Sequence, residues 1–454
     1  MQEHLIPCSE SPTLSDWLDR LQTLHPNAID LGLARVYHVA MAMGLLLSPS
    51  EISCDYSGSL HLPGVNVITV AGTNGKGSCC KIIEQCLLAS GLTVGSYTSP
   101  HVFHYCERIT INGTAVSESL VCQAFAEIDR ARGSITLTYF EYSTLAALWL
   151  FQQQQVDIVI LEVGMGGRLD ATNIVDAEIA VITSIDLDHQ QWLGDDRAAI
   201  AKEKAGICRW GRPGVCADDN PPETLLMLDK DHHCYWIGKE FSSCQQSNKH
   251  WLWQSSTENR DYLLPEPQLP LPSVAAGMQV VSLLNALPAI EQLMTMVTQT
   301  TLPGRYQQLL IKSRHCIFDV AHNPAATQLL AERLKQITIY GKIRAVFAVM
   351  ADKDVPGMLS PLWDCIDHWY IGELTDNPRA ASVASVANLL VENHQRLTET
   401  KDIASALIKA LTDADKDDRI VIFGSFYTVE AALSFVHRNS TDPNNPGLDL
   451  WITA

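Results

Sequence analysis

The sequence feature that most constrains the fold is a strand, a glycine-rich loop and a helix in direct succession. Residues 65–72 (VNVITVAG) have the pattern of a buried strand, and residues 77–91 (GSCCKIIEQCLLASG) that of a helix ending at a glycine. The loop between them, GTNGKGS (72–78), offers backbone N–H groups and the positive end of a helix to a polyphosphate. This succession predicts a phosphate-binding loop.

The loop departs from the general G-x-x-x-x-G-K-[ST] pattern in two places. Val70 holds the first glycine position, and Gly77 separates Lys76 from Ser78. An ordinary glycine-rich turn is therefore the alternative, but the flanking strand and helix favour the phosphate loop. In that loop Lys76 would neutralise phosphate oxygens, and a hydroxyl at the helix start would reach a magnesium ion.

Two series of alternating strands and helices predict an α/β fold with two domains. Apolar runs typical of buried strands lie at residues 156–164, 178–186, 214–217, 315–323, 343–350, 367–374 and 418–426. We expect an N-terminal P-loop ATPase domain with a mostly parallel sheet (1–300) and a smaller Rossmann-like α/β domain (301–454). The boundary is placed near Thr301.

The stretch between the two series is less regular. Residues 218–272 are rich in Gln, Ser, Asp and Pro and contain several Trp, and PEPQLPLP (265–272) within them has the composition of a proline-rich connector. A helical pattern resumes at residues 274–287. We therefore expect this stretch to be less regular than the two series of strands and helices on either side of it.

Charge and composition exclude several classes of partner. The 32 basic and 51 acidic residues give a net charge of −19, which disfavours nucleic acid. No apolar run reaches the length of about 20 residues that a membrane span needs, and residues 1–14 do not resemble a secretory signal. The 13 cysteines are scattered without a CxxC motif, which fits a reducing cytoplasm better than a disulfide scaffold.

Polar side chains follow two of the expected strands. Glu162 ends one strand, and His189 follows the next along the chain. Ligands of open α/β sheets bind at these carboxyl ends, and a carboxylate oxygen suits Mg²⁺. Histidine is an unusual Mg²⁺ ligand, so residue type alone leaves His189 open as a packed or solvated side chain.

Several motifs together resemble the folylpolyglutamate synthase family and, more distantly, the Mur ligases. They are GTNGKGS (72–78), EVGMGGRLDATN (162–173), DHQQWLG (188–194), PGRYQ (303–307) and DVAHNP (319–324). The resemblance implies ATP as a substrate and two Mg²⁺ sites, with a monovalent cation as a further candidate. It implies metal ligands at Ser78, Ser99, Glu162, His189 and Lys204, the last as a carbamate.

The resemblance also implies an ATP site between the two domains. Its residues would be Gly72, Thr73, Asn74, Gly75, Lys76, Gly77, Ser78, Ser273, Arg305, Asp319 and His322, and the catalytic groups Lys76, His189, Lys204 and Arg305. Ser273 stands where the family usually has asparagine, so a direct contact with adenine is in doubt. Residues 352–354 and 378–380 are assigned to the side of the incoming glutamate, and residues 424–426 are left without a role.

The N-terminal part is closest to bifunctional bacterial members of the family. That likeness implies a pterin site built from Asp30, Leu31, Gly32, Tyr139, Phe140, Glu141, Leu169 and Asp170. Tyr139 and Phe140 are equally well explained as core residues, and Asp30 as a helix cap. The implied reaction is ATP-dependent ligation of L-glutamate to dihydropteroate and to reduced folates by a monomeric enzyme. The alternatives are ligation to folates only, a Mur-type amino-acid ligase, or a nucleotide-binding regulator.

Overall fold

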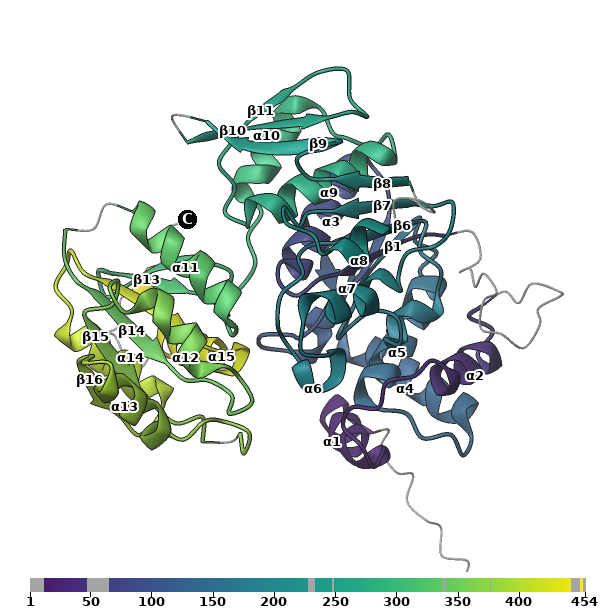
Figure 1. The fold of residues 1–454 in the computed structure, drawn as a ribbon. Coiled ribbons are helices and arrows are strands. Elements are labelled where there is room, and N and C mark those ends of the chain that lie inside the picture. Colours follow the sequence, from purple (N-terminus) through teal and green to yellow (C-terminus); the bar gives the residue numbers. More distant parts are fainter. Residues whose placement is uncertain are drawn as a thin grey trace, which may run out of the picture.

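The structure is a computed structural model that describes residues 12–46, 65–227, 233–246, 249–337, 340–375, 377–441 and 450–451. Two large β-sheets and one small sheet organise these residues, with helices around them (Figure 1). Most of residues 1–14, which were compared with secretory signals, lie outside the described ranges.

The first large sheet consists of eight strands, which are β1 (Asn66–Ala71), β2 (Val94–Tyr97), β3 (Ile109–Ile111), β4 (Thr114–Ala115), β5 (Ile158–Glu162), β6 (Ile179–Ile182), β7 (Pro213–Cys216) and β8 (His233–Trp236). Their spatial order is β4-β3-β2-β5-β1-β6-β7-β8. The strands from β2 to β8 in this order are parallel, whereas β3 and β4 extend one edge as antiparallel strands.

Helices cover both faces of this sheet. They are α1 (Leu14–Leu24), α2 (Ala34–Ala42), α3 (Lys76–Ala89), α4 (Glu118–Arg132), α5 (Tyr139–Gln153), α6 (Gln190–Leu193), α7 (Arg197–Ala205), α8 (Glu223–Leu226), α9 (Leu271–Leu283) and α10 (Ile290–Gln299), with short 3-10 turns η1 (Tyr105–Arg108) and η2 (Ala171–Ile174). Val159 and Leu161 of β5 pack against α1, α2, α4 and α5, while Ile158 and Ile160 pack against α3, α9 and α10. Because both faces are covered, β5 is buried throughout, which explains its continuous apolar run.

The prediction of an irregular stretch between the two series was wrong for residues 241–265. These residues form a small antiparallel sheet of β9 (Phe241–Gln245), β10 (His250–Ser255) and β11 (Tyr262–Pro265), in the order β11-β10-β9 (Figure 1). Trp251 and Trp253, two residues apart on β10, point into the core that α3, α9 and α10 share. The helix α9 also begins earlier than predicted, inside the proline-rich tract.

The second large sheet consists of seven strands, which are β12 (Gln307–Ile311), β13 (Arg314–Phe318), β14 (Ile343–Phe347), β15 (His368–Ile371), β16 (Leu397–Glu399), β17 (Arg419–Phe423) and β18 (Leu450–Trp451). Their order is β16-β15-β14-β17-β13-β12-β18, with β12 and β18 antiparallel to their neighbours. One face packs against α11 (Pro324–Gln336), α12 (Val355–Leu359), η4 (Ser360–Leu362) and α13 (Val383–Glu392), and the other against α14 (Ile403–Asp413) and α15 (Phe426–Thr441).

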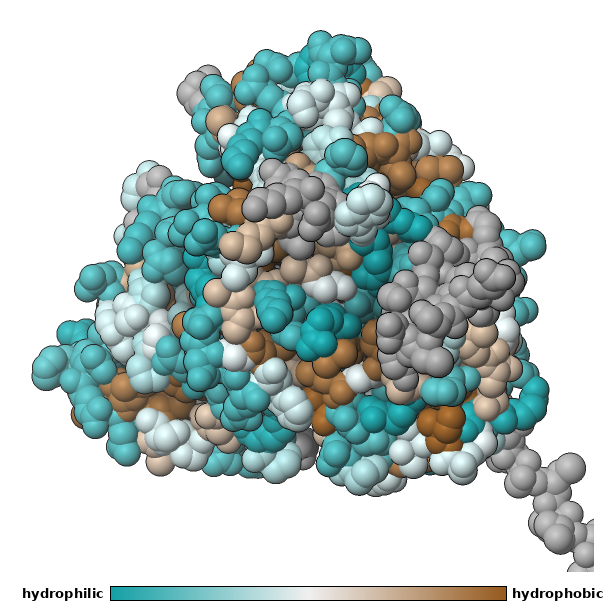
Figure 2. All heavy atoms as spheres, turned by 45° about the vertical axis from the view of Figure 1, so that its right-hand side comes forward, coloured by the Kyte–Doolittle hydropathy of each residue, from teal (hydrophilic) through white to brown (hydrophobic). Residues whose placement is uncertain are grey.

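The α/β prediction is therefore confirmed, with a mostly parallel sheet on each side of the molecule. The chain passes between the two large sheets after Gln299, where α10 ends, and reaches β12 at Gln307. The predicted boundary near Thr301 falls in this stretch, and the division into two domains stays a prediction. None of the helices in the described ranges is long and apolar enough to cross a membrane. Figure 2 shows one face of the molecule, on which patches of hydrophobic residues lie among hydrophilic residues.

Candidate active site

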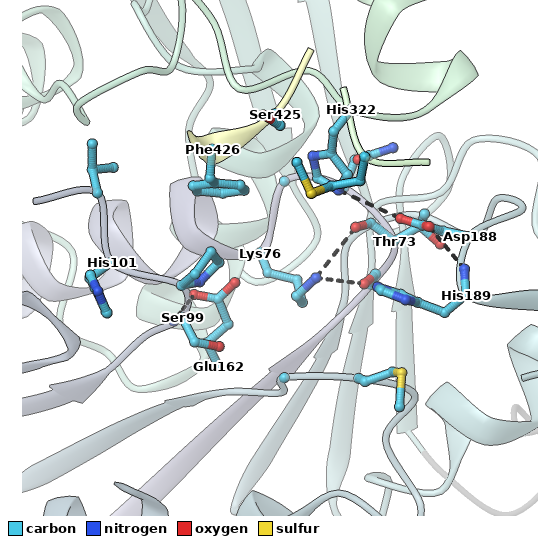
Figure 3. A pocket seen from close by; sticks show the side chains of 18 of the residues that line it. Thr73, Lys76, Ser99, His101, Glu162, Asp188, His189, His322, Ser425 and Phe426 are labelled. Atoms are coloured by element: carbon cyan, nitrogen blue, oxygen red, sulfur yellow. Dashed lines mark hydrogen bonds and ion pairs between the residues drawn. The ribbon is translucent and has the colours of Figure 1, made fainter. Parts of the chain in front are cut away.

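The predicted phosphate loop connects β1 to α3. Gly75, at the start of α3, has φ +85°, a left-handed conformation that favours glycine, and an added Cβ there would collide with Ser273 Oγ. Lys76 Nζ donates hydrogen bonds to the carbonyl oxygens of Gly72 (3.0 Å) and Thr73 (3.3 Å) (Figure 3). The loop thus brings an ammonium group and the first turn of a 14-residue helix to one point.

Two cavities meet at this loop. The first has a volume of about 390 Å³ and reaches the carboxyl ends of β5 and β6. The second has a volume of about 380 Å³ and extends toward the start of α9 and along α11. Asn74 and Gly75 of the loop line both cavities, and so do Arg305 and His322 from the other side. Both cavities therefore lie between the two large sheets.

Glu162 ends β5 and lines the first cavity. Its side chain is buried, and Oε2 accepts a hydrogen bond of 3.2 Å from the backbone N–H of Ser99. Burial raises the pKa of Glu162, while the positive charges of Lys76 and Arg305 oppose that rise. A carboxylate beside two cations and the first turn of α3 is a suitable oxygen ligand for a divalent ion.

Asp188 and His189 lie in the loop between β6 and α6. Burial lowers the pKa of His189 to about 4, although the neighbouring Asp188 carboxylate works in the opposite direction. The imidazole is therefore neutral at pH 7 and keeps a nitrogen lone pair for a ligand. Burial alone would raise the pKa of Asp188, but contacts with His322, His189 and Lys353 lower it well below its ordinary value. Asp188 is therefore a buried anion.

Lys204 is on α7, and its side chain is buried and lines the first cavity. Burial, together with the charge of Lys76, lowers the pKa of Lys204 to about 7, and the carboxylates of Asp188 and Asp170 oppose this effect. At neutral pH, Lys204 is then an uncharged amine in a large fraction of the molecules. The side chain does not point into solvent, the outcome that would have ruled out its predicted role.

The second large sheet contributes Arg305 and Asp319. The guanidinium of Arg305 lies 5.3 Å from the ring centre of Phe426, a cation–π contact that orients it toward both cavities. The carboxylate of Asp319 accepts hydrogen bonds from the backbone N–H groups of Tyr306 (3.0 Å) and Ala321 (2.8 Å). Burial raises the pKa of Asp319, and the charge of Arg305 opposes the rise.

His322 and Asn323 join the second sheet to the phosphate loop. His322 Nδ1 donates to the carbonyl oxygen of Val320 at 2.9 Å, which leaves Nε2 facing Asp188. Asn323 caps α11 and exchanges two side-chain hydrogen bonds with Asn74. Residues far apart in the sequence therefore meet at the loop (Figure 3).

The predicted pterin residues form a separate group near α2 and α5. Arg35 makes ion pairs with Asp30 (2.8 Å) and with Glu141 (3.1 Å), and Glu141 also closes the capping box of α5 with Thr138. Asp30 does not cap α2, whose first flanking residue is Leu33. Glu141 thus has structural partners whether or not it contacts a pterin.

Phe140 and Asp170 are also held by the protein itself. The ring of Phe140 lies 5.8 Å from that of Tyr97, and an added Cβ at Gly164 would collide with it. Asp170 caps η2 and accepts hydrogen bonds from Thr172 and from the backbone N–H of Met165. These contacts explain the burial of Asp170 and the partial burial of Phe140 without a ligand.

The structure brings most of the predicted ATP and metal residues together. The first cavity is lined by Gly72, Thr73, Asn74, Gly75, Lys76, Ser99, Glu162, His189, Lys204, Arg305 and His322. The second is lined by Asn74, Gly75, Ser78, Ser273, Arg305, Asp319 and His322. Gly77 lies in the first turn of α3 beside Glu162. None of the eight predicted pterin residues, all within the described ranges, lines either cavity: Asp30, Leu31, Gly32, Tyr139, Phe140, Glu141, Leu169 and Asp170.

Several residues that line the first cavity received no role of their own from the sequence, among them Arg108 and Asp188. Arg108 lies over the ring of Tyr139, with 5.5 Å from Cζ to the ring centre, and donates to His101 Nδ1 at 2.8 Å. Lys353 was assigned only loosely to the glutamate side, and Asp188 stood in a quoted motif without a role. For Asp188 the available signal was its position next to the motif histidine His189, whereas no local pattern identified Arg108.

The residues at the loop fit a divalent metal. Ser78 Oγ is buried in the first turn of α3 and, within the described parts of the chain, has no hydrogen-bond partner. A hydroxyl left unpaired at that position suits the oxygen-rich coordination of Mg²⁺. No three His, Cys, Asp or Glu side chains in the described residues are gathered as a metal site, so a metal here would also need Ser, Lys or substrate oxygens.

Comparisons with known proteins agree with this arrangement. Residues 70–259 match the Mur ligase middle domain, and residues 304–426 match the Mur ligase glutamate ligase domain. The chain is 40% identical over 432 residues to the dihydrofolate synthase/folylpolyglutamate synthase of Escherichia coli K12, which covers 95% of this chain and 97% of that protein.

Solved structures show the same likeness. The E. coli enzyme in complex with DHPP and ADP is 39% identical with a TM-score of 0.86, covering 95% of this chain and 99% of that one. A bifunctional folylpolyglutamate synthase/dihydrofolate synthase with Mn, AMPPNP and L-glutamate bound is 40% identical with a TM-score of 0.83, covering 94% and 100%. The chain therefore belongs to the dihydrofolate synthase/folylpolyglutamate synthase family of ligases.

Proposed function

We propose that this protein ligates L-glutamate to dihydropteroate, giving dihydrofolate, and to reduced folates, giving folylpolyglutamates, at the expense of ATP. The single observation that carries the proposal is the meeting of the two cavities at Asn74, Gly75, Arg305 and His322. A nucleotide in the second cavity would place its terminal phosphate at this junction, next to a carboxylate substrate in the first. The relatives with DHPP and ADP, and with AMPPNP and L-glutamate, support the same assignment.

The chemistry follows from the charges at the junction. An oxygen of the substrate carboxylate attacks the γ-phosphorus, the bond to ADP breaks, and an acyl phosphate forms. The glutamate amine then attacks the acyl carbon, loses a proton, and inorganic phosphate leaves. Lys76 and Arg305 both line the first cavity, and the charges of both act on Glu162, so they would stabilise the charge on the transferring phosphoryl group.

The proposed metal ligands are Ser78 and Ser99, Glu162, His189 and a modified Lys204, arranged as two Mg²⁺ sites. A bound Mg²⁺ ion supplies charge neutralisation for the phosphate oxygens. The unpaired hydroxyl of Ser78, the carboxylate of Glu162 and the neutral imidazole of His189 support this assignment. A relative that binds Mn with AMPPNP supports the use of a divalent ion.

Lys204 is proposed to carry a carbamate. Its uncharged amine would attack the carbon of CO₂ and lose a proton, which converts a cation into an anion. A buried ammonium beside Lys76 would repel a metal, whereas a carbamate would bind one. The lowered pKa of Lys204 is the property that this reaction requires, because only the neutral amine is nucleophilic.

The pterin is proposed to bind near Asp30, Leu31 and Gly32 and the start of α5, with Tyr139, Phe140, Glu141, Leu169 and Asp170. Arg108 supports this placement, because it lines the first cavity and also contacts Tyr139, which begins α5. The glutamate side is proposed to include Lys353 and Arg379, which line the same cavity. A monomeric state, a cytoplasmic location and a role for a monovalent cation stay predictions.

The deciding experiment is phosphate release by the purified protein with ATP, Mg²⁺ and L-glutamate, with the product masses recorded. Dihydropteroate, a reduced folate and no pterin are compared. Glutamate addition to both pterins supports the proposal, and addition to the reduced folate alone reduces it to a folylpolyglutamate synthase. If neither pterin leads to phosphate release, the folate assignment is overturned, and Mur-type substrates are tested next.

A further inference from the structure

The carboxylate of Asp188 lies between the two large sheets, and its long-range partners come from the second one. Asp188 Oδ1 pairs with Lys353 Nζ at 2.6 Å, and Oδ2 lies 3.6 Å from His322 Nε2. Asn323 Nδ2 also donates to Oδ2 at 3.3 Å. The side chains of Asp188 and Lys353 are only 9% and 11% exposed, so water screens this pair weakly.

These contacts tie one loop of the first sheet to two separate loops of the second. Asp188 follows β6, His322 and Asn323 follow β13, and Lys353 follows β14. Asn323 also connects this group to the phosphate loop, because its side-chain amide forms hydrogen bonds with the side-chain amide of Asn74. The group of Asp188, Asn323, Lys353, His322 and Asn74 is called the seam cluster below.

We propose that Asp188 is a positioning residue, which seats Lys353 and the turn at His322 and Asn323 against the phosphate loop. The inference rests on the proposed function, since it assigns a role within that reaction. Asp188 acts through Lys353: its carboxylate holds the ammonium inside the first cavity, where the incoming amino acid would meet it. Without this partner, Lys353 would regain its rotamer freedom, and the second sheet would lose its ion pair with the loop between β6 and α6.

A purely local role for Asp188 is the competing explanation. Its Oδ1 also accepts a hydrogen bond of 2.9 Å from the backbone N–H of His189, which helps to shape that turn. If this were its main contribution, loss of the carboxylate would act through His189 and would not depend on Lys353. A double-mutant cycle separates the two explanations, because only directly coupled residues give non-additive effects.

The cycle compares Asp188→Asn, Lys353→Met and the double variant in the full-length enzyme. We expect Asp188→Asn to lower kcat/KM for L-glutamate by about 10- to 100-fold while the Kd for ADP changes by less than about threefold. We expect the double variant to lie within about twofold of Lys353→Met alone. Multiplicative losses, or an Asp188→Asn enzyme with wild-type kinetics, would overturn the inference.

Asp129→Asn is the matched control, since Asp129 forms an ion pair of 3.0 Å with Arg20 on α1, in a helical region outside both cavities. Hydrogen exchange of the ADP-bound enzyme gives a readout independent of turnover. Amides of residues 350–355 and 320–323 are expected to exchange faster in Asp188→Asn and not in Asp129→Asn, and unchanged exchange would also overturn the inference. A wild-type enzyme that ligates no pterin would instead refute the proposed function, with the exchange result still deciding the role of Asp188.

Discussion

Asn74 of the phosphate loop and Asn323 at the start of α11 exchange two side-chain hydrogen bonds, of 3.1 and 3.0 Å, across 249 positions of sequence. The same Asn323 oxygen accepts from the backbone N–H of Ala326 and caps α11. One side chain thus stabilises a helix and joins two sheets, and the two roles can be separated by substitution.

Asn323→Asp keeps the capping oxygen but removes both amide donors and places a second carboxylate beside Asp188. We expect thermal stability to change by about 1 kcal/mol or less, since Asp and Asn cap equally well and the repulsion is local. We expect kcat/KM to fall about tenfold or more, because repulsion between the two carboxylates would separate the residues of the seam cluster. Thermal unfolding and steady-state kinetics check this, with Asp402→Asn at the cap of α14 as the control. Wild-type turnover would contradict it.

Lys204 provides a test of the carbamate and its pH dependence. Its pKa of about 7 lies below the ordinary 10.5, so the fraction of neutral amine rises as pH increases through 7. The initial rate at which the apo enzyme captures ¹³C-labelled CO₂ should therefore rise roughly tenfold between pH 6 and pH 8 at a fixed CO₂ concentration. Carbon NMR measures the carbamate signal. Lys204→Ala should lack it, whereas Lys202→Ala, an exposed position on the same helix, should retain it.

Ser78→Ala tests the hydroxyl at the start of α3. Since Ser78 Oγ is buried without a hydrogen-bond partner in the described parts, its removal should not destabilise the free enzyme. If it binds Mg²⁺, kcat/KM for Mg-ATP should fall about 10- to 100-fold. Thr69→Val removes another buried, unpaired hydroxyl that lines neither cavity, so it should leave turnover unchanged. Equal effects of the two substitutions would refute the metal role of Ser78.

Gly75→Ala tests the shape of the phosphate loop. The left-handed φ of +85° costs a residue with a side chain about 1–2 kcal/mol, and the new methyl group would also collide with Ser273 Oγ. Gly91→Ala carries a similar φ of +82° in open space and isolates the backbone cost. Gly75→Ala should therefore be less stable than Gly91→Ala and should bind ADP more weakly. Ser273→Ala should recover part of the difference in stability, as measured by denaturant unfolding.

Local patterns explain which parts of the fold the sequence predicts. The strand β5 is apolar along its whole length because both of its faces are covered, so its run of residues identifies it. In β10 the core-facing Trp251 and Trp253 alternate with less buried residues, and the polar composition around them conceals that alternation. The small sheet was missed because composition was weighed above the two-residue period.

The site shows the same limit. The phosphate loop is continuous in the sequence, so its residues were identified and the structure brings most of them to the cavities. The pair of Asp188 and Lys353 spans 165 positions and exists only because two sheets meet, which no local pattern reveals. Residue type alone left His189 open, because imidazole is an unusual Mg²⁺ ligand, and only the structure shows that its side chain is close to Asp188 and lines the first cavity.

The two cavities share four lining residues and are otherwise distinct. A compound built to fill both would touch the first sheet through Asn74 and Gly75 and the second through Arg305 and His322. Its affinity would then depend on how the two large sheets are positioned relative to each other. A substitution that weakens the contacts between the sheets would reduce the affinity of this compound more than that of a nucleotide bound in one cavity. The affinity of the compound would therefore report on the alignment of the two large sheets, in addition to any inhibition.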